Sequence, residues 1–338
     1  MSVDPEFLAI LKERGARDTD IEAAAAAGQH ALNGLAAELL ISPPGELSLD
    51  EVAAAAGVEP SQVVACWRSL GFADPSAAEV VFSAADVQLL QTIAMLDALL
   101  PNDTVAELIR VWGSSAQQVA HASVNAMRVG FEQPMRAGGG DETDIELAYG
   151  EIVNEILPGV VEAWGTMFRH HLVASSYEMV AVSQDGSVQS TQTVAFVDLV
   201  GFTAYSQRAD AGELMRTLSR YEASVNAVAA RHSGRVVKLL GDGVMLRFAN
   251  RGDAVSALRE IVMTGDGPAC RAGIATGATL TRQGDFYGPV VNLASRLAGV
   301  VAAGEVAVDA SAPVDDCELQ PPVALKGFDE PVAFYRLT

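Results

Sequence analysis

Hydrophobic residues recur with a different period in each half of the chain. Before about Tyr177 they repeat every three or four positions, as in QHALNGLAAELLI (29–41), which is typical of helices that bury one face. Alternation of apolar and polar residues, which marks a half-buried strand, is not found in this half. The first half is therefore predicted to be all-α.

Short apolar runs and amphipathic stretches follow each other in the second half. TVAFVDL (193–199) predicts a buried strand, and GRVVKLLGDGVMLRF (234–248) predicts a hairpin, because Asp-Gly is a strong hairpin signal. This order is a β-α-β-β-α-β core with additions, a ferredoxin-like arrangement, so the whole chain is predicted to be α+β. The expected strands are 193–199, 235–248 (the hairpin), 270–276, 305–308, 322–326 and 332–337, with an arm at 279–287 and helices at about 211–231, 252–263 and 289–299.

A polar segment separates the two halves. The stretch YEMVAVSQDGSVQSTQ (177–192) becomes polar after Val182 and predicts a linker. At 338 residues, two domains are expected rather than one. They are an all-helical domain at 1–176 and a second domain at 193–338.

One part of the first half has the pattern of a helix-turn-helix. In SLDEVAAAAGVEPSQVVACWRSLGF (48–72), Ser48 and Glu51 form a capping box and Gly57 makes a turn before a second helix. DNA binding needs lysines and arginines opposite the phosphates, and the second helix offers only Arg68. A helical hairpin used for packing is therefore preferred, and a DNA-binding regulator is the alternative.

The net charge of −21 is concentrated in the first half. Residues 1–190 contain eight Lys and Arg against 27 Asp and Glu, whereas the remainder contains 14 against 16. The acidic half argues against a nucleic-acid partner. The nearly neutral half suits an enzyme that must admit a polyanion.

Hydropathy and cysteine spacing indicate a cytoplasmic protein. No run of about 18 uncharged apolar residues occurs, so no membrane span is predicted. The start MSVDPEF has no basic segment, so no signal peptide is predicted. Cys66, Cys270 and Cys317 have neither metal-ligand nor disulfide spacing, which suits a reducing compartment.

Two aspartates stand beside predicted strands in the second half. Asp198 follows the apolar run Val194–Val197, and a hairpin folded at Leu240–Gly243 would bring Asp242 beside the end of that strand. Two converging carboxylates with no basic neighbour repel each other, and Mg²⁺ or Mn²⁺, which prefer oxygen ligands, would relieve the repulsion. The spacing equally fits a turn residue at 242 and a helix N-cap at 198.

Three separated motifs resemble the catalytic domain of class III nucleotide cyclases, from about Thr193 to the C-terminus. They are FVDLVGFT with Asp198, KLLGD with Lys238 and Asp242, and DFYGPVVNLASR with Asp285, Asn292 and Arg296. The resemblance implies an adenylyl cyclase that converts ATP to 3′,5′-cyclic AMP and pyrophosphate. A guanylyl or dual-specificity cyclase is the alternative, as is a helix-turn-helix regulator with a vestigial cyclase domain.

The resemblance also implies residue roles. Asp198 and Asp242 would hold two divalent ions, Mg²⁺ or Mn²⁺, in each active site. Lys238 and Asp285 match the purine-selecting pair: an ammonium donates to adenine N1, and a carboxylate accepts from the 6-amino group. The other matched positions are Asn292 for the ribose, Arg296 for charge on the α-phosphoryl group, Phe202 and Thr203 in the phosphate-cradling loop 200–203, and Arg271 and Lys326 for the polyphosphate.

In this family the metal aspartates come from one subunit and the purine pair, asparagine and arginine from the other. The chain contains one complete set, so the resemblance implies a homodimer with two shared active sites and an inactive monomer.

The acidic first half resembles the N-terminal regulatory domain of actinobacterial cyclases. This resemblance implies autoinhibition, with protons and fatty acids as effectors. His121, His170 and His171 are candidate proton sensors, or else ordinary capping and surface residues, and clustered carboxylates would sense acid equally well. A helix expected at 144–172 ends with Arg169, His170 and His171, basic residues that suit a helix C-terminus. The apolar segment 92–100 fits a lipid pocket or, more simply, core packing.

Overall fold

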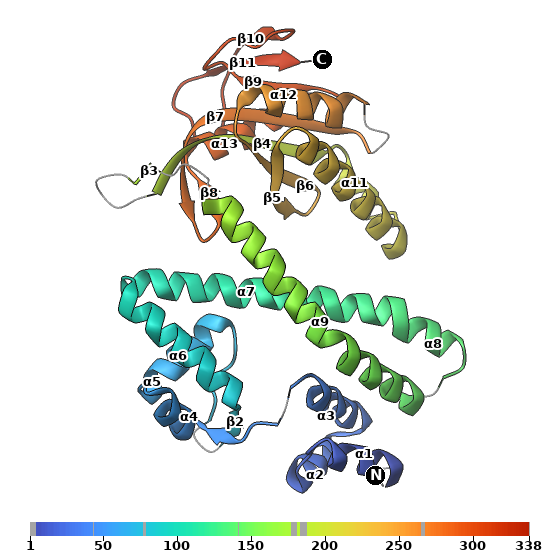
Figure 1. The fold of residues 1–338 in the computed structure, drawn as a ribbon. Coiled ribbons are helices and arrows are strands. Elements are labelled where there is room, and N and C mark those ends of the chain that lie inside the picture. The colour runs from blue at the N-terminus through green and yellow to red at the C-terminus, as the bar shows by residue number, and fades with distance from the viewer. Residues whose placement is uncertain are drawn as a thin grey trace. The chain divides into compact units, whose positions relative to one another are not determined.

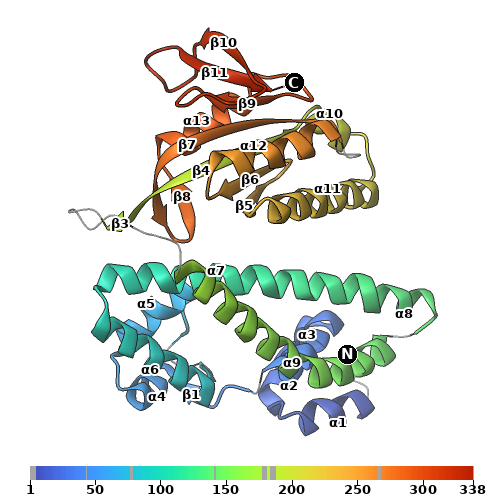
Figure 2. The ribbon, with the colours of Figure 1, turned by 45° about the horizontal axis from the view of Figure 1, so that its top comes forward.

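A computed structural model describes residues 5–42, 44–76, 79–140, 142–176, 181–182, 188–264 and 268–337. The chain divides into two compact units, Met1–Tyr177 and Glu178–Thr338. Helices make up most of the first unit and a β-sheet dominates the second (Figures 1 and 2). Most of the predicted linker, at 177–180 and 183–187, lies outside the described residues. None of the described helices combines the length and apolarity needed to cross a membrane.

The first unit is built from helices, as predicted, and it also contains a short ladder that the sequence analysis did not expect. β1 (Leu47–Ser48) and β2 (Val80–Phe82) pair antiparallel, and strands of two and three residues are too short to show a period in the sequence. The helices are α1 (Pro5–Glu13), α2 (Asp18–Ala27), α3 (Gln29–Ile41), α4 (Leu49–Ala56), α5 (Pro60–Leu70), α6 (Ala84–Leu99), α7 (Asn102–Met127), α8 (Gln133–Ala137) and α9 (Glu142–Ser176), with a π-helical turn at Arg128–Glu132.

The predicted helix-turn-helix is α4 and α5. Ser48 and Glu51 form the expected capping box, and Gly57 ends α4 at a φ of 74°, in the left-handed region that glycine tolerates. Buried side chains of both helices, such as Val63 of α5, pack against α6 and α7. The fully buried Phe82 of β2 belongs to the same core. The motif therefore serves as one side of a hydrophobic core.

The long helix α9 extends beyond its predicted end. It continues to Ser176, four residues past Leu172, so the basic residues from Arg169 to His171 do not form its last turn. His170 and His171 are exposed on α9, and His121 is exposed on α7. These positions leave the predicted role of the histidines untested.

The second unit has the predicted ferredoxin-like core. Its strands β4 (Val188–Leu199), β5 (Gly234–Leu240), β6 (Gly243–Phe248) and β7 (Cys270–Arg282) lie in the order β7-β4-β6-β5, with each neighbouring pair antiparallel. α11 (Ala211–Arg231) and α12 (Arg251–Arg259) connect them. Beyond β7 the sheet continues through β9 (Val306–Asp309), β11 (Val332–Leu337) and β10 (Glu318–Val323), and β3 (Ala181–Val182) and β8 (Asp285–Tyr287) pair with β4 and β7.

Three strands differ clearly from the prediction. β4 begins at Val188 rather than 193, β7 ends at Arg282 rather than 276, and β10 covers 318–323 rather than 322–326. The early part of β4 pairs with the far end of β7, from Gln189 opposite Leu280 to Thr193 opposite Thr276. Polar residues dominate this part of β4, so its sequence lacks the apolar alternation that marked the rest of the strand.

Different helices cover the two faces of the sheet. Ala195, Val197 and Leu199 of β4 are buried with residues of α11 and α12, whereas Val194 is buried with residues of α13 (Pro289–Ala298). Side chains alternate between faces along a strand. Asp198, four positions after Val194, therefore lies on the α13 face.

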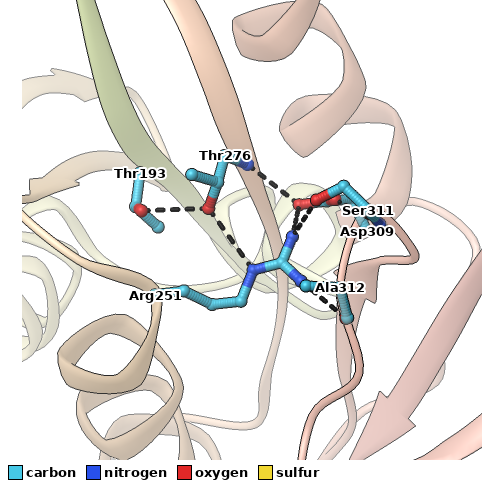
Figure 3. Close-up of polar contacts among 6 residues, drawn as sticks. All are labelled: Thr193, Arg251, Thr276, Asp309, Ser311 and Ala312. Carbon is cyan, nitrogen blue, oxygen red and sulfur yellow. Dashed lines mark hydrogen bonds and ion pairs between the residues drawn. The ribbon is translucent and has the colours of Figure 1, made fainter.

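A buried polar network fixes the end of the sheet opposite Asp198. Arg251, at the start of α12, places Nη2 2.5 Å from Asp309 Oδ2, and it donates hydrogen bonds to the Ala312 carbonyl and Ser311 Oγ, at 2.8 and 2.6 Å. The Thr276 N–H donates to the same Asp309 oxygen at 2.9 Å. The complete network is Thr193, Arg251, Thr276, Asp309, Ser311 and Ala312, from β4, α12, β7, β9 and the segment that follows β9 (Figure 3).

Replacing Arg251 with alanine is expected to destabilise the second unit strongly. Asp309, whose side chain is 5% exposed, would keep a buried charge without its partner, which typically costs about 3–5 kcal/mol. The measurement is the urea-induced unfolding of the full chain. Arg259→Ala is the control, because Arg259 is 43% exposed and lies 3.7 Å from an exposed Asp316, a surface pair worth at most about 1 kcal/mol. Equal effects of the two substitutions would contradict this account of the network.

Candidate active site

The structure places Asp198 and Asp242 side by side. Asp198 is opposite Gly243 in the β4–β6 ladder, and Asp242 lies in the β5–β6 turn, where its carbonyl accepts from the Leu199 N–H at 3.3 Å. Gly241 has a φ of 72° in this turn, a conformation that suits glycine in a two-residue hairpin. The hairpin thus brings the second aspartate to the end of the first aspartate's strand.

Asp198 has a basic neighbour, which the sequence analysis did not expect. Arg271 Nη2 and Nε donate to Asp198 Oδ2 at 3.0 and 3.3 Å. The two residues are directly opposite in the β4–β7 ladder. The expectation of two carboxylates without a basic neighbour is therefore wrong, because the partner comes from a strand 73 residues further along the chain.

Tyr221 of α11 is buried, and its hydroxyl has no hydrogen-bond partner among the described residues. Burial is the main cause that raises the pKa of Tyr221, and the Cys270 thiol and the carboxylates of Asp198 and Asp242 add to the increase. Sequence reasoning missed Tyr221, because a tyrosine on an amphipathic helix carries no signal beyond core packing.

The carboxylates fit a hard divalent cation. Both side chains are partly accessible, and the described residues contain no group of three or more His, Cys, Asp and Glu side chains that could complete a metal site. Mg²⁺ typically takes one or two carboxylates from a protein and completes its shell with water and substrate phosphates. Asp198 and Asp242 are the residues that could hold such an ion here.

Lys238 and Asp285 form a second charged pair. Lys238 of β5 donates to Asp285 Oδ2, and Asp285 Oδ1 accepts the N–H of Phe286 at 2.8 Å. Lys238 is opposite Met245, which is buried on the α13 face. Directly opposite residues share a face of the sheet, so this pair lies on the same face as Asp198.

The two charged pairs occupy different places on that face. Neighbouring strands lie ~4.8 Å apart and each residue advances a strand by ~3.3 Å, so the α-carbons of Asp198 and Lys238, two strands and two residues apart, are separated by roughly 12 Å. One copy of the chain therefore does not close the two pairs around one small group.

α13 carries the other two central positions. Asn292 and Arg296 are both exposed, and their spacing of four residues places them on one side of the helix. Other residues of α13 are buried against the sheet. At Gly273 of β7 a Cβ atom would lie 2.2 Å from the Ala294 carbonyl oxygen, so the helix approaches the strand at a distance that only glycine allows.

The peripheral candidates are more dispersed. Phe202 and Thr203 begin the short helix α10 (Phe202–Ser206), where Gly201 has a φ of 75°. Phe202 packs partly against the core under α11, and Thr203 is exposed. Lys326 is exposed between β10 and β11, towards the opposite edge of the sheet from β5. The structure does not bring Lys326 next to Lys238.

Comparison with known proteins decides the family. No family model matches the chain. An adenylate cyclase of Streptomyces coelicolor is 31% identical over 265 residues, which cover 77% of this chain and 68% of that protein. The chain belongs to the class III adenylyl cyclase family. It is therefore an enzyme, an adenylate cyclase by family, and the prediction made from its three motifs is confirmed at that level.

Two further relatives match most of the chain. The pH-sensitive adenylate cyclase MT1302 of Mycobacterium tuberculosis is 30% identical over 295 residues, which cover 81% of this cyclase and 71% of the relative. The uncharacterized protein Rv2212 of Mycobacterium tuberculosis is 31% identical over 318 residues, which cover 90% and 83%. Among solved structures, the adenylyl cyclase CyaB of P. aeruginosa is 25% identical and covers 44% of this chain and 94% of that chain, with a TM-score of 0.38.

Gly273→Ala is expected to lower nucleotide turnover at least tenfold. The new Cβ must push α13, and with it Asn292 and Arg296, away from β7. A displacement of about 1 Å at an active site can lower the reaction rate about a hundredfold. Gly277→Ala is a matched control on the same strand, where the Cβ would meet only the side chain of Val290, at 3.3 Å. Turnover is measured for both variants after confirming that each is folded. Equal turnover would show that the close approach at Gly273 does not position the helix.

Proposed function

We propose that this cyclase is specific for ATP and makes 3′,5′-cyclic AMP and pyrophosphate in active sites shared by two copies of the chain. The observation that carries the proposal is the arrangement on the α13 face. Asp198, with Asp242 beside it, lies on the same face of the sheet as the pair Lys238 and Asp285, and the α-carbons of Asp198 and Lys238 are roughly 12 Å apart. The finer assignments rest on the motif resemblance and on the chemistry of these groups.

Lys238 and Asp285 are the proposed purine-selecting residues. The ammonium can donate to adenine N1, and the carboxylate can accept from the 6-amino group. Guanine presents a donor at N1 and an acceptor at O6, so the same pair opposes it. The ion pair between the two side chains supports this role, because it holds both groups close together until a base replaces the contact.

Asp198 and Asp242 are the proposed metal ligands. Two divalent cations bound there would lower the pKa of the ribose 3′-hydroxyl and neutralise the triphosphate. Phe202 and Thr203 would offer main-chain N–H groups to phosphate oxygens, and Arg271 and Lys326 would offer positive charge to the polyphosphate. The exposure of Thr203 and Lys326 is compatible with these roles.

Asn292 and Arg296 complete the proposed site. Asn292 would orient the ribose, and Arg296 would stabilise the charge that develops on the α-phosphoryl group in the transition state. Both point out of one side of α13. In a two-fold dimer, this side and the purine pair of one copy would face the aspartates of the other, so each site would draw on both copies.

Complementation tests this arrangement. Asp242→Asn and Arg296→Ala are each expected to be inactive alone, because each disables every site. In an equal mixture, random exchange gives heterodimers with one intact site, so turnover should recover to about a quarter of the unmodified enzyme. The control mixes Asp198→Asn with Asp242→Asn, which disable the same half-site and should not recover. Failure of the first mixture to recover would place each site within one copy.

Substrate choice is tested by comparing ATP with GTP in the full chain. The pairing chemistry predicts that ATP turnover exceeds GTP turnover by at least about tenfold. Comparable rates would instead indicate the dual-specificity alternative. Salt-dependent DNA binding without any nucleotide turnover would favour the regulator with a vestigial cyclase domain. Against that alternative, Arg68 of α5 forms a two-point ion pair with Asp74, with both distances 2.5 Å.

We further propose that the first unit is autoinhibitory and binds a fatty acid, with protons as a second effector. The support for the ligand is a half-open cavity of about 750 Å³ in this unit, lined mainly by apolar side chains. Its volume and composition fit a small apolar ligand. The residues that line it include Leu89, Leu108, Trp112, Trp164 and Phe168, together with His121. The predicted segment 92–100 does not line it, since Ile93 is buried in the core and Met95 and Leu99 are exposed.

Filling the cavity tests the effector proposal. Ala120→Phe, on α7 in the cavity wall, is expected to abolish the effect of oleate on turnover by occupying its space. Ala122→Phe is the matched control, because Ala122 is exposed on the same helix and does not line the cavity. Oleate is titrated into the full chain at fixed pH while turnover is recorded. An unchanged oleate response in Ala120→Phe would exclude this cavity as the binding site.

A further inference from the structure

Arg271 makes contacts at two ends of its guanidinium group. Its Nη2 and Nε atoms donate to Asp198 Oδ2 at 3.0 and 3.3 Å, and its Nη1 atom donates to the Gly299 carbonyl at 3.4 Å. Because Arg271 and Asp198 are directly opposite in an antiparallel ladder, their proximity is fixed by strand register. The contact is therefore part of the fold of a single copy.

The contact between Arg271 and Asp198 balances the negative charge that gathers where the hairpin turn brings Asp242 beside Asp198. The β5–β6 hairpin brings Asp242 to the end of β4, and two like charges so placed repel each other. The guanidinium supplies the opposite charge to Asp198. Both side chains are partly exposed, 31% for Arg271 and 37% for Asp198, so a cation from solvent can reach the carboxylate.

A guanidinium and a divalent cation compete for the same carboxylate. Both are positive, so they repel each other at contact distance, and Arg271 already donates two hydrogen bonds to one oxygen of Asp198. A cation that coordinates Oδ2 must therefore displace Arg271 from that oxygen. The flexible arginine side chain would then be free to turn towards the anionic part of a nucleotide.

Displacement would also break the contact with α13. Gly299 is the C-cap of α13, the helix that carries Asn292 and Arg296. A cation at a helix C-terminus stabilises that end through the helix dipole. Arg271 therefore links β4, through Asp198, to the end of this helix.

We propose that Arg271 is the built-in counter-ion of Asp198, which a divalent cation displaces before the guanidinium serves the polyphosphate. The inference rests on the proposed metal role of Asp198 and Asp242, and it goes beyond that role by giving Arg271 a function in the absence of nucleotide. Arg271 is in this sense a positioning residue: it holds the carboxylate in place and weakens metal binding to the nucleotide-free enzyme.

The sign of the effect on metal affinity distinguishes this role from others. Loss of the arginine should tighten Mn²⁺ binding without nucleotide, by about three- to tenfold, which corresponds to removing one partly screened competitor. A side chain that only contacts polyphosphate would leave this affinity unchanged. A side chain that only supports the fold would weaken it when removed.

The experiment measures Mn²⁺ binding to the full chain by calorimetry, without nucleotide and at constant ionic strength. Arg271→Ala and the more nearly isosteric Arg271→Gln should both bind Mn²⁺ more tightly, and their melting temperatures without metal should fall while the Mn²⁺-induced increase grows. Arg259→Ala is the control. Arg259 lies on α12, and its replacement removes one positive charge and the ion pair with Asp316. This variant should match the unmodified chain.

The possible failures are separable. Unchanged or weaker Mn²⁺ binding in both Arg271→Gln and Arg271→Ala would overturn the counter-ion proposal. If Asp242→Asn also binds Mn²⁺ as the unmodified chain does, the proposed metal site itself is wrong. If Asp242→Asn loses Mn²⁺ binding while Arg271→Gln gains it, both proposals are supported.

Discussion

The register of β4 is the constraint on which the second unit depends. Side chains alternate along a strand, so a slip of one residue would exchange the faces of every position. Ala195, Val197 and Leu199 fill the core under α11 and α12, and Val194 fills the core under α13. Because both faces are buried, neither can accept the other's side chains, and Asp198 is forced onto the α13 face at the strand end. The same register places Arg271 opposite it.

Two carboxylates of the candidate site, Asp198 and Asp285, each meet an opposite charge within their own copy. Asp198 has Arg271, and Asp285 has Lys238. These pairs are partly exposed, so their contribution to stability is small and they are easily exchanged for other partners. The buried pair of Arg251 and Asp309 at the other end of the sheet is different, because its desolvated charges cannot be separated without a large cost. The exchangeable pair of Asp198 and Arg271 thus lies at one end of the β4–β7 ladder, and the fixed pair lies beyond Thr276, towards the other end.

Local sequence patterns predicted the order of the helices and strands. They could not predict which residues face each other across the sheet. The Asp-Gly hairpin and the apolar runs placed β4, β5 and β6 because each signal lies within a few residues. The contact between Arg271 and Asp198 joins residues 73 positions apart, and only the ladder register makes them neighbours. β1 and β2 were missed because they are too short to show a period, and α9 runs past its predicted end because basic residues at a C-terminus are only a weak preference.

The helix-turn-helix of the first unit shows why shape alone does not assign a function. α4 and α5 have the expected cap and turn, yet DNA binding depends on the positive charge that neutralises phosphates. Arg68, the one basic residue in α5, already donates from Nε and Nη2 to the two carboxylate oxygens of Asp74. The buried side of the motif, with Val63 and Cys66 in one core with Phe82, gives it a sufficient physical role. The helices that complete this core include α7, which also lines the apolar cavity. The motif is therefore better explained as structural support for that cavity than as a DNA-binding element.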